Sequence, residues 1–410
     1  MPLYRVGPSG SSSHPIATLI MLPRLLVRSP TSFFTRFRTH RTMAAPIPVN
    51  VAVIGVGLVG SEFISQLLGL PQPSPFKLIS LTSSSRTLFS PSAPLAPGAD
   101  WKAALAASSE KPDLAKLTDQ LAALVSPQQK VAIIDNTSSE DVAARYPAWL
   151  EKGINVVTPN KKAFSGDVAL YDALVGATAK SGAKCFHEAT VGAGLPVIST
   201  LKDLVATGDK ILKIEGVFSG TMSYIFNEFS TGAAGGPAFS AVVKEAREKG
   251  YTEPHPADDL NGADVARKLA ILARVAAPAR DAKLPKLGSF ADVETKSLIP
   301  APLEGVKTGD EFVARLPEFD GEFTGLREEA SKAGEVLRFV GVVDAVKGEV
   351  KAGLERYSSQ HPFATALGGS DNIIMFHTER YSPRPLIVQG AGAGAAVTAM
   401  GVLADLLRLV

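Results

Sequence analysis

The sequence predicts an α/β fold with a largely parallel sheet, and three observations lead to this class. The run Val49–Ile54 is apolar, as is typical of a strand buried on both faces of such a sheet. A glycine-rich turn, Gly55–Gly60, follows it at once, and a helix with an apolar face comes next. The segments 131–140 and 153–164 repeat the order of apolar strand and polar loop that βα units produce. We therefore expect strands and helices to alternate through the first half.

The composition is that of an ordinary globular chain. Its 410 residues are 45% hydrophobic and 20% charged, with a net charge of +2, which is enough for two domains with sizeable cores. The near-neutral balance gives no reason to expect nucleic acid or an anionic membrane as partner, and no apolar run reaches the roughly 18 residues of a membrane span. A single cysteine, Cys185, excludes an intrachain disulfide framework and predicts a reducing, cytoplasmic compartment.

The N-terminal segment differs in kind from the rest. No Asp or Glu occurs in residues 1–61, whereas arginines and serines are plentiful before Met43. This composition is typical of an organelle transit segment, which would predict a mitochondrial location. Alternatively, translation starts at Met43 and residues 1–42 belong to an upstream extension. In either case we treat residues 1–44 as an N-terminal extension outside the fold.

The glycine-rich turn has the spacing of a dinucleotide-binding turn. Gly55 permits a tight turn, Gly57 lets the backbone approach a pyrophosphate, and Gly60 lets helix and strand pack closely. The N–H groups at the start of the helix then face the phosphates. A purely structural turn is the alternative, but this motif between such a strand and such a helix predicts a Rossmann-type dinucleotide-binding domain. The expected cofactor contacts are Gly55, Val56, Gly57, Leu58, Val59 and Gly60.

The end of the second predicted strand concerns the choice of cofactor. An NAD-specific site places an acidic residue there to bind the ribose hydroxyls, whereas this chain has Thr82 and three serines followed by Arg86. Hydroxyl groups and a guanidinium suit a 2′-phosphate better than a diol. The sequence therefore favours NADP over NAD, unless Arg86 is simply exposed.

Polar residues end two further strands of the predicted sheet. Asp135–Ser138 follow one strand, and Asn160, Lys161 and Lys162 follow the other. Ligands bind at the carboxyl ends of the strands in such sheets. One of the two lysines is thus a candidate to hold a substrate carboxylate, and a solvated turn is the alternative.

The second half of the chain predicts a mixed α/β region. Residues 335–345 and 349–357 are expected to form adjacent antiparallel strands joined by a Lys-Gly turn, and residues 370–381 add another strand. Near the C-terminus, the alternating glycines of 390–394 precede an apolar helix and predict a turn that packs closely over the cofactor.

Residues 251–270 concentrate charge in an otherwise rather apolar chain. Asp264 and Lys268 are four residues apart on a predicted helix, so they share one of its faces. A surface salt bridge worth a few tenths of a kcal/mol is one interpretation. A polar substrate pocket with a proton donor is the other, and the acidic loop that precedes the helix favours it.

Together these motifs resemble one family, the homoserine dehydrogenases, and specifically their single-function fungal type. The segments that carry the resemblance run in family order from Val49 to the C-terminus: VAVIGVGLVGS, DNTSS, TPNKKAF, HEATVGAGLP, IEGVFSGTMSYIFNEFS, YTEPHPADDLNGADVARK, SLIP, SDN and VQGAGAGAAVTAMGVLADL. The resemblance implies reversible reduction of L-aspartate 4-semialdehyde to L-homoserine with a nicotinamide cofactor, in threonine and methionine biosynthesis. It also implies a homodimer.

The resemblance further implies how the chain is divided. A nucleotide-binding domain would comprise residues 45–187, completed by 391–410. A dimerisation region would comprise 188–196 and 337–390, and a catalytic, substrate-binding region would comprise 197–336.

Roles carry over to the matching residues in the same way. The resemblance implies that Lys268 donates a proton, with Asp264 and Lys161 also catalytic. The expected ligands of the zwitterionic substrate, whose ammonium needs carboxylates, are Glu253, Asp258, Asp259 and Asp264. Further cofactor contacts would be Thr137, Lys161, Gly250 and Gly394. A sodium ion would use Glu188 and the carbonyl groups of Val191, Ala193 and Leu195, although spacing alone predicts only a tight turn there.

A lysine suits the expected reaction because hydride transfer to an aldehyde leaves negative charge on the oxygen. A cationic lysine stabilises this alkoxide and can give it a proton. His255 is a weaker candidate, since a histidine between two prolines is expected to be exposed. Two other interpretations are less favoured. A semialdehyde dehydrogenase would need an activated cysteine, but Cys185 lies in an apolar strand context with no helix start, and a non-catalytic NADP sensor would be expected to have lost Lys268, Asp264 or Glu253, all of which are present.

Overall fold

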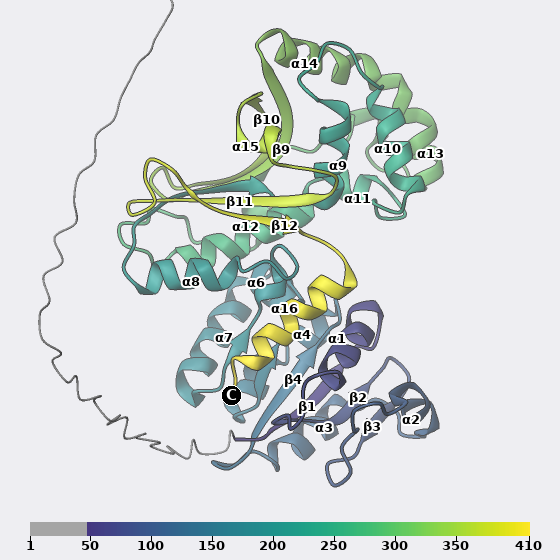
Figure 1. Cartoon of the computed structure of the whole chain (residues 1–410), viewed down its shortest axis with the longest axis vertical. Coiled ribbons are helices and arrows are strands. Elements are labelled where there is room, and N and C mark those ends of the chain that lie inside the picture. Colours follow the sequence, from purple (N-terminus) through teal and green to yellow (C-terminus); the bar gives the residue numbers. More distant parts are fainter. Residues whose placement is uncertain (1–46) are drawn as a thin grey trace, which may run out of the picture. The chain divides into compact units, whose positions relative to one another are not determined.

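The computed structural model describes residues 47–410, and these contain two six-stranded sheets with helices packed on them (Figure 1). The predictions made for residues 1–44, a transit segment or an upstream extension, lie outside the described residues. No helix among residues 47–410 has the length and apolar character needed to cross a membrane.

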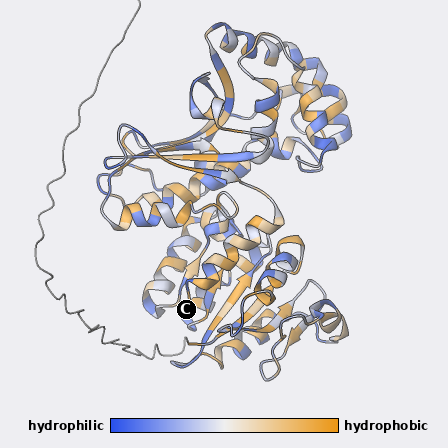
Figure 2. Ribbon diagram, viewed as in Figure 1, coloured by the Kyte–Doolittle hydropathy of each residue, from blue (hydrophilic) through white to orange (hydrophobic). Residues whose placement is uncertain are grey.

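The first sheet has the strand order β3-β2-β1-β4-β5-β6 and is parallel except for β3, which pairs antiparallel with β2. Its strands are β1 (Val49–Ile54), β2 (Phe76–Thr82), β3 (Thr87–Phe89), β4 (Lys130–Asp135), β5 (Asn155–Val157) and β6 (Cys185–Phe186). The predicted parallel sheet is confirmed. Every residue of β1 is buried, as expected for a central strand covered on both faces, and Figure 2 shows the middle of this sheet as largely hydrophobic.

Two groups of helices cover the first sheet. The C-terminal helix packs beside the helix that follows the glycine turn and shares a hydrophobic core with β1. The helices on this face are α1 (Leu58–Leu68) and α16 (Ala395–Leu407). The other core of the sheet includes side chains from α3 (Leu114–Ala122), α5 (Tyr146–Glu151) and α7 (Val168–Ser181).

The second sheet has the order β12-β11-β7-β9-β10-β8 and is antiparallel except for the short pairing of β8 with β10. Its strands are β7 (Ile211–Val217), β8 (Glu294–Thr295), β9 (Glu335–Asp344), β10 (Glu349–Ser358), β11 (Asp371–Thr378) and β12 (Leu386–Ala391). The predicted β9–β10 hairpin and the predicted strand β11 are confirmed.

The remaining helices surround this second sheet or connect its strands. The helices that contact β9 include α9, α12 and α14. The helices of this region are α8 (Ile198–Ala206), α9 (Gly220–Phe229), α10 (Phe239–Glu248), α11 (Ala257–Leu260), α12 (Ala263–Ala276), α13 (Gly309–Arg315), α14 (Asp320–Lys332) and α15 (Pro362–Thr365). Short helices α2 (Trp101–Ala107), α4 (Glu140–Ala143) and α6 (Lys162–Ser165) belong to the connections of the first sheet.

The strand order of the first sheet determines where a ligand can bind. The chain runs outward from β1 through β2 to β3 and then crosses to β4, on the other side of β1. The strand order therefore reverses between β1 and β4. Loops that leave the carboxyl ends of these two strands diverge and leave a crevice. The glycine turn follows β1 and residues 136–139 follow β4 at this point.

Candidate active site

The glycine turn has the geometry that its three glycines predict. Gly55 has a φ of +87°, a left-handed value that favours glycine. A Cβ added to Gly60 would lie 2.0 Å from the Gly55 carbonyl oxygen, so only glycine allows α1 to begin this close to the turn. A Cβ at Gly57 would meet nothing within 4 Å, which leaves open space in front of the first helical turn. This arrangement fits a dinucleotide pyrophosphate.

A cleft of about 860 Å³ joins this crevice to the second sheet. Its walls come from segments far apart in the sequence, including the loops after β4 and β5, the acidic loop before α12, and the glycines after β12. The predicted site residues among its walls are Val59, Thr137, Lys161, Ala193, Gly250, Glu253, Asp258, Asp259, Asp264, Lys268 and Gly394. The fold therefore brings together most of the residues that the sequence nominated.

Lys268 lies on α12 with its side chain only 9% exposed. Its ammonium is 2.7 Å from Oδ2 of Asp264 and donates a hydrogen bond of 2.7 Å to the Phe218 carbonyl oxygen. Burial lowers the pKa of Lys268, and Asp264 opposes this shift. The predicted i,i+4 pair is present, but the buried ammonium on the wall of the cleft distinguishes it from an ordinary surface salt bridge.

Asp264 lies between two ammonium groups. Its Oδ1 is 3.3 Å from Nζ of Lys161, which approaches from the loop after β5, while Oδ2 contacts Lys268. Desolvation acts to raise the pKa of Asp264, but Lys268 and Lys161 outweigh it and hold this pKa well below its usual range. Asp264 is therefore a carboxylate at neutral pH and favours the charged form of Lys268.

Three more carboxylates line the cleft beside this group. Glu253 and Asp258 are exposed, and Oδ2 of Asp259 accepts a hydrogen bond of 2.8 Å from the Glu253 backbone N–H. Burial raises the pKa of Asp259. No basic side chain among residues 47–410 forms an ion pair with Glu253, Asp258 or Asp259. These acids are thus free to bind the ammonium of an amino-acid substrate.

A buried hydrogen-bond network holds the loops after β4 and β5, and the sequence did not predict it. We expected Asp135 to be among the polar groups at the ligand edge, but this side chain is fully buried. It accepts hydrogen bonds from the Tyr146 hydroxyl, from the Asn160 side chain at 3.1 Å and from the Thr137 backbone at 2.8 Å. Asp135 therefore fixes the two loops that carry Thr137 and Lys161.

A smaller pocket of about 430 Å³ lies beside the glycine turn and includes Val56, Ser83 and Arg86. The Arg86 guanidinium donates hydrogen bonds to the carbonyls of Ala106 and Ser108, at 2.6 and 2.7 Å. Lys102, on α2, also lines this pocket and was not nominated from the sequence. Nothing in its local sequence distinguishes it from other surface lysines. Two cations thus face the place where the adenosine end of a dinucleotide would lie.

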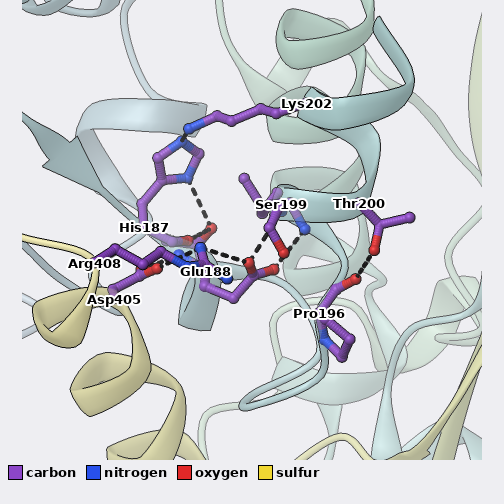
Figure 3. A network of polar contacts seen from close by, with 10 residues as sticks. His187, Glu188, Pro196, Ser199, Thr200, Lys202, Asp405 and Arg408 are labelled. Carbon is purple, nitrogen blue, oxygen red and sulfur yellow. Dashed lines mark hydrogen bonds and ion pairs between the residues drawn. The ribbon is translucent and has the colours of Figure 1, made fainter. Parts of the chain in front are cut away.

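The residues nominated for a sodium ion lie between β6 and α8. Both carboxylate oxygens of Glu188 are engaged at the start of α8, where they accept hydrogen bonds from the Ile198 and Ser199 backbones at 2.6 and 3.0 Å (Figure 3). Arg408 from the end of α16 adds an ion pair of 3.3 Å. Among residues 47–410 no cluster of three His, Cys, Asp or Glu side chains could hold a metal, so a cation would depend on backbone carbonyls.

The backbone of this loop is compatible with such a cation. The carbonyl oxygens of Val191 and Ala193 accept no hydrogen bond from residues 47–410, whereas that of Leu195 accepts one from Val197 at 2.8 Å. Ala193 also has a positive φ of 52°, which is uncommon for a residue with a side chain. Free carbonyl oxygens are the kind of ligand that a hard cation takes.

Two side chains weighed against Lys268 are arranged differently. Burial raises the pKa of the Cys185 thiol to about 12, which makes it a poor nucleophile and counts against thioester chemistry. His255 was expected to be exposed, and this was wrong: it is half-buried, with Nε2 2.9 Å from the Val306 carbonyl oxygen. It is not among the residues that line the cleft.

Comparisons with known proteins agree with this arrangement. Residues 196–407 match the sequence model of the family described as homoserine dehydrogenase, and residues 55–188 match the model of the homoserine dehydrogenase NAD binding domain. A homoserine dehydrogenase from Saccharomyces cerevisiae is 49% identical, over 88% of this chain and 98% of the relative. One from Emericella nidulans is 50% identical over the same shares of the two chains.

Solved structures give the same picture of the fold. A Candida auris protein whose function is described as unknown is 45% identical, with a TM-score of 0.82 over 88% of this chain and 98% of that one. A putative homoserine dehydrogenase from Archaeoglobus fulgidus is 23% identical with a TM-score of 0.65, over 88% of this chain and 99% of that one, and shows the shared fold.

Proposed function

The chain belongs to the homoserine dehydrogenase family of NAD(P)-dependent oxidoreductases, and on this premise we propose that it interconverts L-aspartate 4-semialdehyde and L-homoserine with Lys268 as the proton donor. One observation carries the proposal: a buried ammonium lies on the wall of a cleft that is also lined by loops of the first sheet and by three carboxylates without an ion pair in the described part of the chain. A proton donor, a cofactor crevice and ligands for an amino acid around one space are what the proposed reaction requires.

A bound reduced nicotinamide supplies the hydride that reaches the aldehyde carbon. Lys268 stabilises the negative charge that develops on the oxygen and gives it a proton. Asp264 keeps Lys268 charged and in place, and Lys161 shares that carboxylate while it binds the carboxylate of the substrate. Glu253, Asp258 and Asp259 bind the substrate ammonium.

The glycine turn and the loops around it hold the cofactor in this proposal. The turn residues bind the pyrophosphate, and Thr137, Gly250 and Gly394 contact the rest of the molecule from the walls of the cleft. Arg86 and Lys102 face the adenosine end with two positive charges, which suits the 2′-phosphate of NADP. We therefore propose NADP as the preferred cofactor over NAD.

The proposal also covers a cation and an assembly. A sodium ion would be held by Glu188 and the carbonyls of Val191, Ala193 and Leu195, and those of Val191 and Ala193 accept no hydrogen bond within residues 47–410. We propose a homodimer formed through residues 188–196 and 337–390. The nucleotide-binding domain is proposed as 45–187 with 391–410, and the catalytic region as 197–336.

We propose that the enzyme acts in the cytoplasm, or in mitochondria if residues 1–42 are a transit segment. A fusion of residues 1–42 to a fluorescent protein distinguishes the two, because a transit segment moves the fluorescence to mitochondria and an upstream extension leaves it in the cytoplasm.

The activity itself is tested by mixing the purified chain with L-homoserine and NADP or NAD at alkaline pH. The absorbance of the reduced cofactor is followed, with a blank that lacks homoserine. Homoserine-dependent reduction of the cofactor supports the reaction, and the ratio of the two rates tests the roles of Arg86 and Lys102. A chain that binds NADPH but shows no turnover would instead be the non-catalytic sensor.

A further inference from the structure

We infer that Asn372 is a positioning residue that aims the Lys268 ammonium into the cleft, acting through the Phe218 carbonyl group. The Asn372 side chain is fully buried on β11 and donates a hydrogen bond of 3.0 Å to the Phe218 carbonyl oxygen. The same oxygen accepts the 2.7 Å hydrogen bond from Lys268. This inference rests on the proposed role of Lys268 as proton donor and adds the residue that orients it.

The geometry of an ammonium explains why a second fixed acceptor matters. Lys268 has three N–H groups, and two of them are directed to Asp264 and to the Phe218 carbonyl oxygen. Because the three groups diverge tetrahedrally, fixing two of them also fixes the direction of the third. The third group is then the one that can reach a substrate oxygen in the cleft, and its aim depends on both acceptors.

The position of Phe218 explains why its carbonyl group needs a partner. β7 ends at Val217, and the last pair of its ladder with β11 is Val217 with Ile373. Phe218 therefore lies just beyond the regular hydrogen bonds of the sheet. Asn372 precedes Ile373 on β11, and its side-chain amide donates a hydrogen bond to the Phe218 carbonyl oxygen just beyond the last backbone pair. This bond holds the carbonyl group in place.

Gly392 leaves the space that Asn372 occupies. A Cβ at this position would lie 2.0 Å from Cγ and 2.1 Å from Nδ2 of Asn372. Gly392 does not have a positive φ, so its backbone would tolerate a side chain. It is contact with Asn372 that excludes one. Gly392 lines the cleft, and the buried Asn372 amide packs against it while donating a hydrogen bond to the carbonyl group that holds Lys268.

The experiment compares Asn372→Ala with Asn155→Ala, Lys268→Met and the unchanged full-length enzyme. Asn155 is a matched control, since it is also buried on a strand and its side chain donates a 2.8 Å hydrogen bond to a carbonyl oxygen, but its partners are Val131 and Lys184 and not the Phe218 carbonyl group that holds Lys268. We expect kcat of Asn372→Ala to fall about tenfold or more, the scale that small misplacements produce. We expect Asn155→Ala to keep kcat per folded enzyme.

The pH profile separates positioning from general damage. A carbonyl acceptor favours the charged form of Lys268. Without Asn372 the Phe218 carbonyl group is free to turn away from Lys268, and the weakened hydrogen bond moves the limb of the kcat profile that reports this lysine to lower pH. The other ionisable groups that act on Lys268 are Asp264 on its own helix, Lys161 after β5 and Asp259 on α11, and all three stay unchanged. An unchanged profile with kcat near that of Asn155→Ala overturns the inference.

A second variant covers the case in which Asn372→Ala fails to fold. Gly392→Ala keeps the amide but pushes it away, so it should lower kcat and shift the profile in the same direction. A double variant, Asn372→Ala with Gly392→Ala, tests whether the two residues act through each other. With Asn372 shortened the added methyl group has room, so Gly392→Ala should lower kcat less in this background than in the unchanged enzyme.

Two outcomes overturn the inference: an equal loss of kcat in the two backgrounds, or a Gly392→Ala enzyme with normal kcat and a normal pH profile. Retained turnover in Lys268→Met would instead overturn the proposed function.

Discussion

The two sides of the cleft differ in whether backbone or side chains form most of the site. On the side of the first sheet, the cofactor crevice consists mainly of backbone: a glycine turn and the N-terminus of α1. On the side of α12, the site consists of side chains: Lys268 and Asp264 are in contact, three acids lie beside them, and Lys161 reaches Asp264 from the loop after β5. Substitutions that add atoms to a glycine should therefore disturb the first side most, and substitutions that remove a charged group should disturb the second side most.

The largest expected effect tests the side-chain half. Lys268→Met removes the proposed proton donor and should lower kcat by about 10²-fold or more, the usual contribution of a general acid. Binding of NADPH, measured by fluorescence, should be retained because the glycine turn is untouched.

A matched control for this variant lies on the exposed face of α10. Lys244 and Glu248 form an i,i+4 pair of 3.9 Å, and both side chains are more than 60% exposed. Lys244→Met should leave kcat unchanged. If Lys268→Met and Lys244→Met have equal rates, Lys268 is only a salt-bridge partner and the comparison between the two sides fails.

The next effect tests the backbone half by adding one methyl group at each of two glycines. In Gly60→Ala the new Cβ meets the Gly55 carbonyl oxygen, a backbone atom that no rotamer change can move. We expect a loss of about 1–3 kcal/mol in the free energy of unfolding, measured by urea denaturation. In Gly57→Ala the methyl group points into open space, so stability should change by about 0.5 kcal/mol or less.

The cofactor distinguishes these two glycine variants further. The methyl group of Gly57→Ala occupies the approach of the pyrophosphate, and the KM for NADP should rise about tenfold while the fold is kept. Equal stability losses in both variants would show that the turn is a structural feature without a special place for phosphate.

A third prediction concerns a place on the first side, apart from the loops that carry Thr137 and Lys161, where side chains are expected to matter. Arg86→Ala and Lys102→Ala each remove a charge from the pocket beside the glycine turn. Because hydrogen bonds to charged groups contribute about 1.5–3 kcal/mol, the KM for NADP should rise about tenfold in each variant. Kinetics with NAD, which lacks the 2′-phosphate, are the internal control and should change little. A parallel loss with both cofactors would contradict a phosphate contact.

The same contrast explains what could be predicted from the sequence. The backbone half depends on short segments, so the apolar run Val49–Ile54 and the spacing of three glycines are sufficient to predict it. The hairpin of β9 and β10 followed from local alternation in the same way. The pairing of Asp264 with Lys268 also follows from a local rule, their separation of four residues on a helix, whereas their expected roles come from the family resemblance.

The contacts that were missed depend on the tertiary fold. Asn372 reaches the Phe218 carbonyl group only because β11 pairs with β7, two strands that are far apart in the sequence. Asp135 was placed at the ligand edge from its position at a strand end, yet its side chain turns inward to Tyr146 and Asn160. Strand-end position gives the edge of the sheet but not the direction of a single side chain.

The smallest expected effect shows that charge on the first side can act on stability without acting on catalysis. Asp405, on α16, accepts hydrogen bonds from the Glu188 backbone at 2.7 Å and from Arg408 at 2.9 Å (Figure 3). Burial raises the pKa of this carboxyl to about 6, above the value of about 3.9 for an unfolded aspartate. The stability that Asp405 contributes is therefore fully present below about pH 4 and is lost as the pH rises through 6.

Asp405→Asn keeps an oxygen for the Glu188 N–H but no longer titrates. Between pH 5 and 7.5 the free energy of unfolding of the unchanged chain should fall by about 1 kcal/mol more than that of the variant, because only the unchanged chain must release this proton. Urea denaturation at the two pH values measures the difference, and other titrating groups cancel in the comparison. The kcat per folded enzyme should be the same in both chains, since Asp405 does not line the cleft. Parallel stability curves would show that Asp405 is already ionised at pH 5, with Arg408 as its dominant partner.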